Sequence, residues 1–336
     1  MQLQKKKYNL VDFFKLFFAV MVVVLHTRLI SDTCSEDFNW YFEHLLLRLA
    51  VPFFFVVSGF FLGNKLNKDG GDVFAIWKKY CGKMLLPLIV WGGLNLPFDI
   101  VIYCNGQSVG YTIEYIVKTI LFFPSGYMWF LWSCIIAATV ICIVWKFKCK
   151  YILLGIASAG SFGLALLCDS YYFASLMESH LAKLVRLYFR YFLSQRILFG
   201  LPFIFAGIVL SRLVLNNKIK RIAPIWIMTG IFLAAAVLEV YFIQGRQFFY
   251  GSEMMISYMG LVPCIVLLCL AYNGAWAEKI KNARFLSTGI YYTHAFIIEI
   301  VSLFIDNAVI KFMLVLVLAI ALSTILGKGR WTKKIV

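Results

Sequence analysis

Two short patterns in this sequence combine side chains that can bind anions and move protons. Lys15 and His26 lie eleven residues apart in the apolar stretch YNLVDFFKLFFAVMVVVLHTRL. Eleven residues are close to three helical turns, so both side chains would face the same way, about 16 Å apart along the axis. In FLSTGIYYTHAFIIEIV, the spacing i, i+4, i+7 places Ser287, Tyr291 and His294 on one helical face. An ammonium group suits a phosphate, and imidazole with phenol suits proton transfer.

Further ionisable residues occur in apolar segments. Arg48 lies inside the second segment, with Glu43 and His44 near its outer end. Arg196 opens the sixth segment, Glu239 lies in the outer half of the seventh and Glu253 starts the eighth. Burying such a charge in a membrane costs about 2.5–3.5 kcal/mol, so these groups should face one another or a water-filled cavity. We therefore expect a polar cavity that opens mainly to the outer half. In the alternative, Lys15 extends to the membrane surface and His26 hydrogen-bonds a neighbour at the outer interface.

These residues must be positioned by helices that cross a membrane. The chain of 336 residues is 62% hydrophobic and 14% charged, whereas a soluble domain is about half apolar and a quarter charged. Runs of about 20 apolar residues span the hydrocarbon as helices, and we find no alternating ten-residue segments of a β-barrel. We expect one all-α domain over residues 1–336, a polytopic bundle of about ten transmembrane helices. The predicted spans are 9–30, 41–64, 84–104, 126–145, 151–168, 196–213, 224–243, 253–273, 285–304 and 308–327.

The positive charges set the expected orientation of these spans. The formal net charge is +16, and with the N-terminus inside, most of the 32 Lys and Arg residues fall in cytoplasmic segments. The basic charge therefore describes topology and indicates no nucleic-acid partner. Both termini are expected in the cytoplasm, and the first apolar run is too long for a cleavable signal. The expected location is a bacterial cell membrane, crossed several times.

Two segments between the predicted spans are expected to form helices of their own. A short interfacial or re-entrant helix is expected within residues 105–125, and an amphipathic helix on the outer surface over 171–192.

The nine cysteines show no metal-ligand spacing, so no metal site is expected. Cys34, Cys104 and Cys168 map near the outer face, which leaves a disulfide there open.

Four segments, in chain order, resemble the integral membrane acyltransferase-3 family, which O-acylates glycans and related acceptors. They are Lys15 with His26, the stretch RLAVPFFFVVSGFFLG from Arg48, the Trp129-Phe130-Leu131 entrance to the fourth span, and the segment from Ser287 to His294. The stretch RILFGLPFIFAGIVL, which includes Arg196, is also similar to the family.

The resemblance implies a donor and a set of catalytic residues. The donor would be acyl-CoA, most often acetyl-CoA, bound from the cytoplasm, with Lys15 and Arg48 as its binding residues. His26 would be the general base or proton relay that activates an acceptor hydroxyl. Tyr291 and His294 would orient the reactants and stabilise charge on the attacked carbonyl.

The resemblance also implies an acceptor, a sugar hydroxyl on an outward-facing or lipid-linked glycan within the lipid membrane. We expect Arg196, Trp129 and Glu239 at the acceptor side of the cavity. Whether a covalent acyl-enzyme forms is left open, since neither Cys nor Ser stands beside His26 in the sequence.

One departure supports a different function. The cation of the first span is Lys, where many family members have Arg, and the two differ in phosphate geometry. The chain is also similar to the membrane portion of the serine racemase of vancomycin resistance, which is regarded as a serine-supplying module. The alternative is therefore a transporter for a small polar solute such as L-serine, with His26 and His294 as proton-coupling groups. The sequence ends at Val336, and it leaves open whether the chain stands alone or belongs to a longer protein.

Overall fold

A computed structural model describes residues 8–67, 72–121, 128–171, 195–216, 221–246, 253–272 and 282–329, with 332 and 335 near the C-terminus. Within these ranges all regular structure is helical, as predicted. The first half contains α1 (Asn9–His26), α2 (Leu29–Thr33), α3 (Glu36–Leu45), the 3₁₀ turn η1 (Leu47–Leu49), α4 (Ala50–Leu66), α5 (Val73–Cys104), α6 (Val109–Leu121) and α7 (Trp129–Val144). The second half contains α8 (Lys150–Cys168), α10 (Gln195–Leu215), α11 (Ala223–Ile243), α12 (Tyr258–Ala271), α13 (Ala283–Ser302) and α14 (Ala308–Lys328).

Every predicted span overlaps one of these helices. Within the described part of the chain, seven helical segments are long and apolar enough to cross a membrane, and α7 and α12 are shorter apolar helices. Large apolar side chains such as Trp226, Ile231 and Leu238 on α11 are exposed, as expected for a surface that faces lipid. The protein is therefore a multi-pass, all-α membrane protein, whereas ten crossings and cytoplasmic termini stay predictions.

Some helix boundaries differ from those expected. The first helix ends at His26 because Arg28 has a left-handed backbone, with φ 58°. The second predicted span is broken by η1 between α3 and α4. In contrast, α5 begins at Val73, where the Asp72 side chain accepts a hydrogen bond from the Phe74 amide at 2.9 Å. The outer helix predicted over 171–192 lies outside the described residues, apart from Tyr171.

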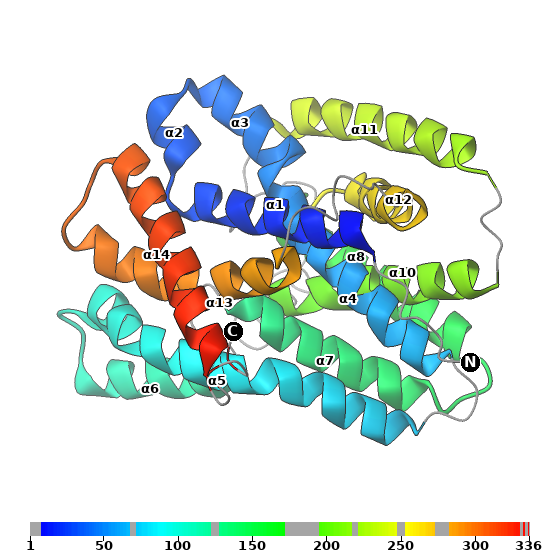
Figure 1. Ribbon diagram of the computed structural model, residues 1–336, viewed down its shortest axis with the longest axis horizontal. Helices are drawn as coiled ribbons and strands as arrows, with labels where there is room; N and C mark the ends of the chain where they lie inside the picture. The colour runs from blue at the N-terminus through cyan, green and yellow to red at the C-terminus, as the bar shows by residue number, and fades with distance from the viewer. Residues whose placement is uncertain are drawn as a thin grey trace, which may run out of the picture.

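The tightest helix packing joins α4 and α10. A Cβ on Gly59 would stand 2.1 Å from the Ile204 carbonyl oxygen, and one on Gly207 would stand 2.1 Å from the Val56 carbonyl oxygen. Only glycine allows the two backbones to approach so closely, as small residues commonly do between membrane helices. Figure 1 shows α11 along one edge of the bundle and α5 with α6 along the opposite edge, so α4 and α10 lie in the interior.

Candidate active site

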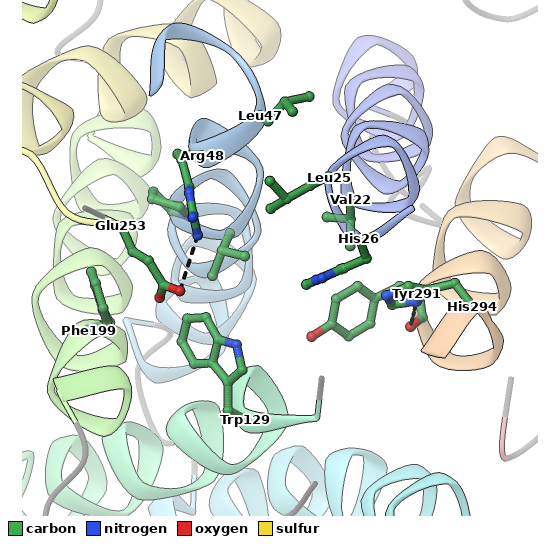
Figure 2. A pocket seen from close by; sticks show the side chains of 12 residues that line it. Val22, Leu25, His26, Leu47, Arg48, Trp129, Phe199, Glu253, Tyr291 and His294 are labelled. Carbon is green, nitrogen blue, oxygen red and sulfur yellow. Dashed lines mark hydrogen bonds and ion pairs between the residues drawn. The ribbon is translucent and has the colours of Figure 1, made fainter. Parts of the chain in front are cut away.

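A small cavity of about 70 Å³ lies in the interior of the bundle, at the end of α1. It is lined by side chains from α1, η1, α4, α7, α10, α13 and the segment before α12 (Figure 2). These side chains are Val22, Leu25, His26, Leu47, Arg48, Val51, Pro52, Trp129, Phe199, Glu253, Tyr291 and His294. A volume of this size holds a few water molecules or one small polar group.

One wall of the cavity carries two imidazoles and a phenol. His26 comes from the last turn of α1 and His294 from the middle of α13, and their rings stack with centroids 5.6 Å apart at 27°. Tyr291 precedes His294 by three residues, with ring centroids 5.7 Å apart. Figure 2 shows the Tyr291 phenol and the His26 ring pointing toward the cavity. The structure thus brings together the three residues that we expect to be catalytic, whereas Ser287 bonds the Arg284 carbonyl and is not in the lining.

The backbone of α13 fixes the tautomer of His294. Its Nδ1 lies 2.7 Å from the Tyr291 carbonyl oxygen and 3.2 Å from that of Ile290. A carbonyl oxygen only accepts hydrogen bonds, so Nδ1 must carry the proton. In the neutral ring Nε2 then keeps its lone pair, which makes this nitrogen the basic one.

The opposite wall carries Arg48 and Glu253, which form an ion-pair network with Glu43 outside the lining (the charged wall: Glu43, Arg48 and Glu253). The Arg48 guanidinium contacts Glu43 Oε1 at 2.6 Å and Glu253 Oε1 at 3.1 Å. The three side chains are only 16–21% exposed. Two carboxylates therefore neutralise Arg48, which makes it a poor binding site for a further anion. This arrangement suits neutral hydroxyl groups, because Glu253 can accept hydrogen bonds from them.

The other predicted site residues lie at different distances from this cavity. Trp129 lines it and packs against Phe199, with ring centroids 5.9 Å apart. Lys15 is not in the lining, and its Nζ stands 5.1 Å from the centroid of the Phe61 ring. Glu239 is also not in the lining, because its carboxylate binds backbone amides of the segment before α12. Arg196 lies in the first turn of α10, and its side chain is outside the described ones.

Glu253 lines the cavity, as expected for an ionisable residue at the start of the eighth span, and Phe199 lines it without having been expected there. Phe199 carries no signal of its own in so apolar a chain. Glu253 stands at the start of a predicted span, and an acidic residue in that place indicates a buried partner. Arg48 is that partner, and pairing the two is the inference that could have been made from the sequence.

No metal centre is found among the residues that the structure describes, since no group of three or more metal-ligating His, Cys, Asp or Glu side chains is present there. Cys34 and Cys104 are free thiols. Cys168 ends α8, and its side chain is not described. The polar groups that line the cavity are thus two imidazoles, a phenol, the Trp129 indole and the paired charges of Arg48 and Glu253.

The fold and cavity define a class, that of multi-pass helical membrane proteins with a buried imidazole pair. Comparison with known proteins then identifies the family. The acyltransferase-3 profile, described as an acyltransferase domain, matches residues 8–328, and the chain belongs to this family. No solved structure matches.

Two curated relatives are amino-acid racemases of Enterococcus faecalis. One is 28% identical over 170 residues, which cover 50% of this chain and 23% of the relative. The other is 24% identical over 336 residues, which cover 96% of this chain and 46% of the relative. The chain thus spans less than half the length of each of these relatives.

Proposed function

We propose that the protein is a membrane O-acyltransferase that moves a short acyl group, such as acetyl, from acyl-CoA at the cytoplasmic face to a hydroxyl of an outward-facing or lipid-linked glycan. The observation that carries the proposal is the stacked His26–His294 pair at the cavity, in a chain of the acyltransferase-3 family.

The reaction that we propose transfers one proton and one acyl group. His26 accepts the proton of the acceptor hydroxyl as its oxygen attacks the thioester carbonyl carbon. The Tyr291 hydroxyl donates a hydrogen bond to the resulting oxyanion. The carbon–sulfur bond then breaks, the acyl group remains on the acceptor oxygen, and the CoA thiolate takes up the proton.

A cluster of cations supports a donor with phosphate groups. Lys65 on α4 lies within electrostatic range of Lys79 and Lys83 on α5 and of Arg284 on α13. Arg284 in turn lies within electrostatic range of Lys15 on α1. Asp12 offsets part of the charge at Lys15, and the cations from the four helices still outnumber it, so they repel one another unless a further anion binds. The pyrophosphate and phosphate of CoA are suitable anions, which is why we assign Lys15 and its neighbours to the donor.

On this assignment, the donor and acceptor ends lie along one helix. Helix α1 runs unbroken from Asn9 to His26, so Lys15 and His26 keep the spacing of about three turns that the sequence predicts. The pantetheine arm of acyl-CoA is long enough to extend over such a distance. Because two carboxylates already neutralise Arg48, we assign it to the acceptor end of the cavity instead of to the CoA phosphates.

The proposal is tested by following radiolabelled acetyl from acetyl-CoA in inside-out membrane vesicles that contain the protein. We expect base-labile label in the lipid-linked sugar or glycan fraction, and a loss of about 10²–10⁴-fold in His26→Ala. Val20→Ala, on the same helix but outside the lining, is the matched control. Full transfer by His26→Ala would remove the proposed base. Uptake of L-serine into proteoliposomes, without any acetyl transfer, would favour the transporter alternative.

A further inference from the structure

The segment of residues 253–257, which leads into α12, has its backbone amides bound by two carboxylates from other helices. The Met254 amide donates to Asp169 Oδ2 at 2.7 Å. The Ile256 and Ser257 amides donate to the two oxygens of Glu239 at 2.6 and 2.8 Å. These amides precede α12, whose own N-cap residue makes no side-chain cap. The first amides of α12 itself bond the carbonyl oxygens of residues 255–257, so the two carboxylates anchor the segment before the helix and do not cap the helix.

Both carboxylates are held in place themselves. Asp169 directly follows α8, is fully buried and also accepts a hydrogen bond from Ser170 at 3.2 Å. Glu239 lies on α11 and accepts a further hydrogen bond from the Tyr171 hydroxyl at 2.6 Å. Hydrogen bonds to an ionised acceptor are roughly twice as strong as neutral ones. The segment is thus fixed to α11 by charge-assisted bonds to Glu239, and to the end of α8 by a hydrogen bond to Asp169, whose pKa burial raises to about 7.

The same segment is tied to α3, which carries part of the charged wall. The Tyr258 hydroxyl donates to the His44 carbonyl oxygen, one residue after Glu43. Met254, Met255 and Tyr258 are fully buried, so the segment has little freedom to move. Glu253 stands at the start of this fixed segment, and its carboxylate reaches into the cavity to Arg48 at 3.1 Å.

We infer that Asp169 and Glu239 are positioning residues that hold Glu253, and through it Arg48, at the acceptor end of the cavity. Glu239 acts through the backbone of the segment and does not touch the acceptor. The inferred effect on catalysis rests on the proposed function. The inferred position of Glu253 does not rest on the proposed function, because it follows from the hydrogen bonds to the segment alone.

The first test needs no activity. Glu239→Gln keeps one acceptor oxygen but places an amide group where the second oxygen accepts a hydrogen bond. Hydrogen exchange of a peptide that covers residues 253–258 should become about tenfold faster in this variant. Glu239→Ala should exchange faster still, and Glu114→Gln, on exposed α6, should match the wild type. Unchanged exchange in both Glu239 variants would overturn the inference.

A double-mutant cycle on melting temperature then tests whether the effect reaches Glu253. If Glu239 positions Glu253, the shift caused by Glu253→Gln should be smaller in the Glu239→Gln background than in the wild type. Shifts that add would show that the two residues act independently, and they would contradict the positioning role. Both measurements use the full chain in detergent, so they decide the inference even if no acetyl transfer is found.

The catalytic consequence is a selective effect on the acceptor. In the acetyl-transfer assay, Glu239→Gln and Asp169→Ala should raise KM for the acceptor severalfold and leave KM for acetyl-CoA unchanged. Asp169→Asn, which keeps one acceptor oxygen for the Met254 amide, should restore most of the affinity. An equal rise in both KM values would indicate general unfolding and contradict the inference. A wild type without transfer would refute the proposed function alone.

Discussion

The two walls of the cavity are built in different ways. His26 and His294 stand on regular helices, and the stacking of their rings follows from the packing of α1 on α13. Arg48 and Glu253 stand on the 3₁₀ turn η1 and on the non-helical segment before α12, and carboxylates from elsewhere hold that segment. In the proposed function, the first wall provides the groups that transfer protons, whereas the second provides fixed charges.

The two walls should also differ in how much stability the protein loses when one of their residues is removed. A neutral imidazole in the lining can be removed without leaving a buried charge behind, so its loss should affect rate more than stability. Removing Arg48 leaves two carboxylates only 16–20% exposed without their cation, which should affect stability first. Substitutions on each wall can therefore test the comparison.

The largest expected effect concerns the wall that carries His26, Tyr291 and His294 (the imidazole wall). His26→Ala and His294→Ala should each lower acetyl transfer by about 10²–10⁴-fold while the melting temperature stays close to that of the wild type. If the two rings act as a unit, the double variant should be no slower than the worse single variant. Initial rates of transfer and thermal melts in detergent measure both quantities. Losses that multiply in the double variant would show that the rings act separately.

The next effect concerns the charged wall. Arg48→Ala should reduce the free energy of unfolding by about 3–5 kcal/mol, because Glu43 and Glu253 lose their common partner. Arg28→Ala is the matched control, since Arg28 pairs with Asp32 at 3.3 Å but is 74% exposed. That pair should contribute no more than about 1 kcal/mol. Equal melting temperatures for the two variants would contradict the distinction between the walls.

A smaller effect is expected from the phenol. Tyr291→Phe removes one hydroxyl from the cavity and keeps the ring that packs against Phe130, with centroids 5.5 Å apart. One lost hydrogen bond to the oxyanion should lower the rate about tenfold, with little change in KM for acetyl-CoA. Transfer kinetics at saturating donor measure this change. A wild-type rate would remove Tyr291 from the catalytic residues.

The wall with the two imidazoles could be predicted from the sequence, whereas the contacts that hold the charged wall in place could not. Helical periodicity places Tyr291 and His294 along one side of α13, and the spacing of Lys15 and His26 follows from the same rule. Packing of α1 on α13 then brings His26 to His294. This contact is expected because the polar faces of two membrane helices turn toward each other and away from lipid. All ten predicted spans contain helices for the same reason, because long apolar runs have few other structures in a membrane.

The position of Glu253 depends on contacts between residues far apart in the sequence. Nothing near Glu253 in the chain shows that Asp169 and Glu239 bind the amides of the following residues. For that reason the sequence places Glu239 in the cavity, whereas in the structure its carboxylate lies outside the cavity and binds the backbone amide of Ile256. Similarly, η1 breaks the second predicted span, although residues 46–49 contain no proline or glycine to mark the break.

The central claim is that one chain joins an acyl-CoA site at Lys15 to a proton-transfer site at His26. It is tested most directly by calorimetric binding of acetyl-CoA to the purified protein in detergent, for the wild type, for Lys15→Ala and for Lys311→Ala on α14 as control. The account predicts saturable binding that Lys15→Ala weakens about tenfold or more and that Lys311→Ala leaves unchanged. Absence of binding by the wild type at millimolar acetyl-CoA, or equal affinity in all three proteins, would contradict it.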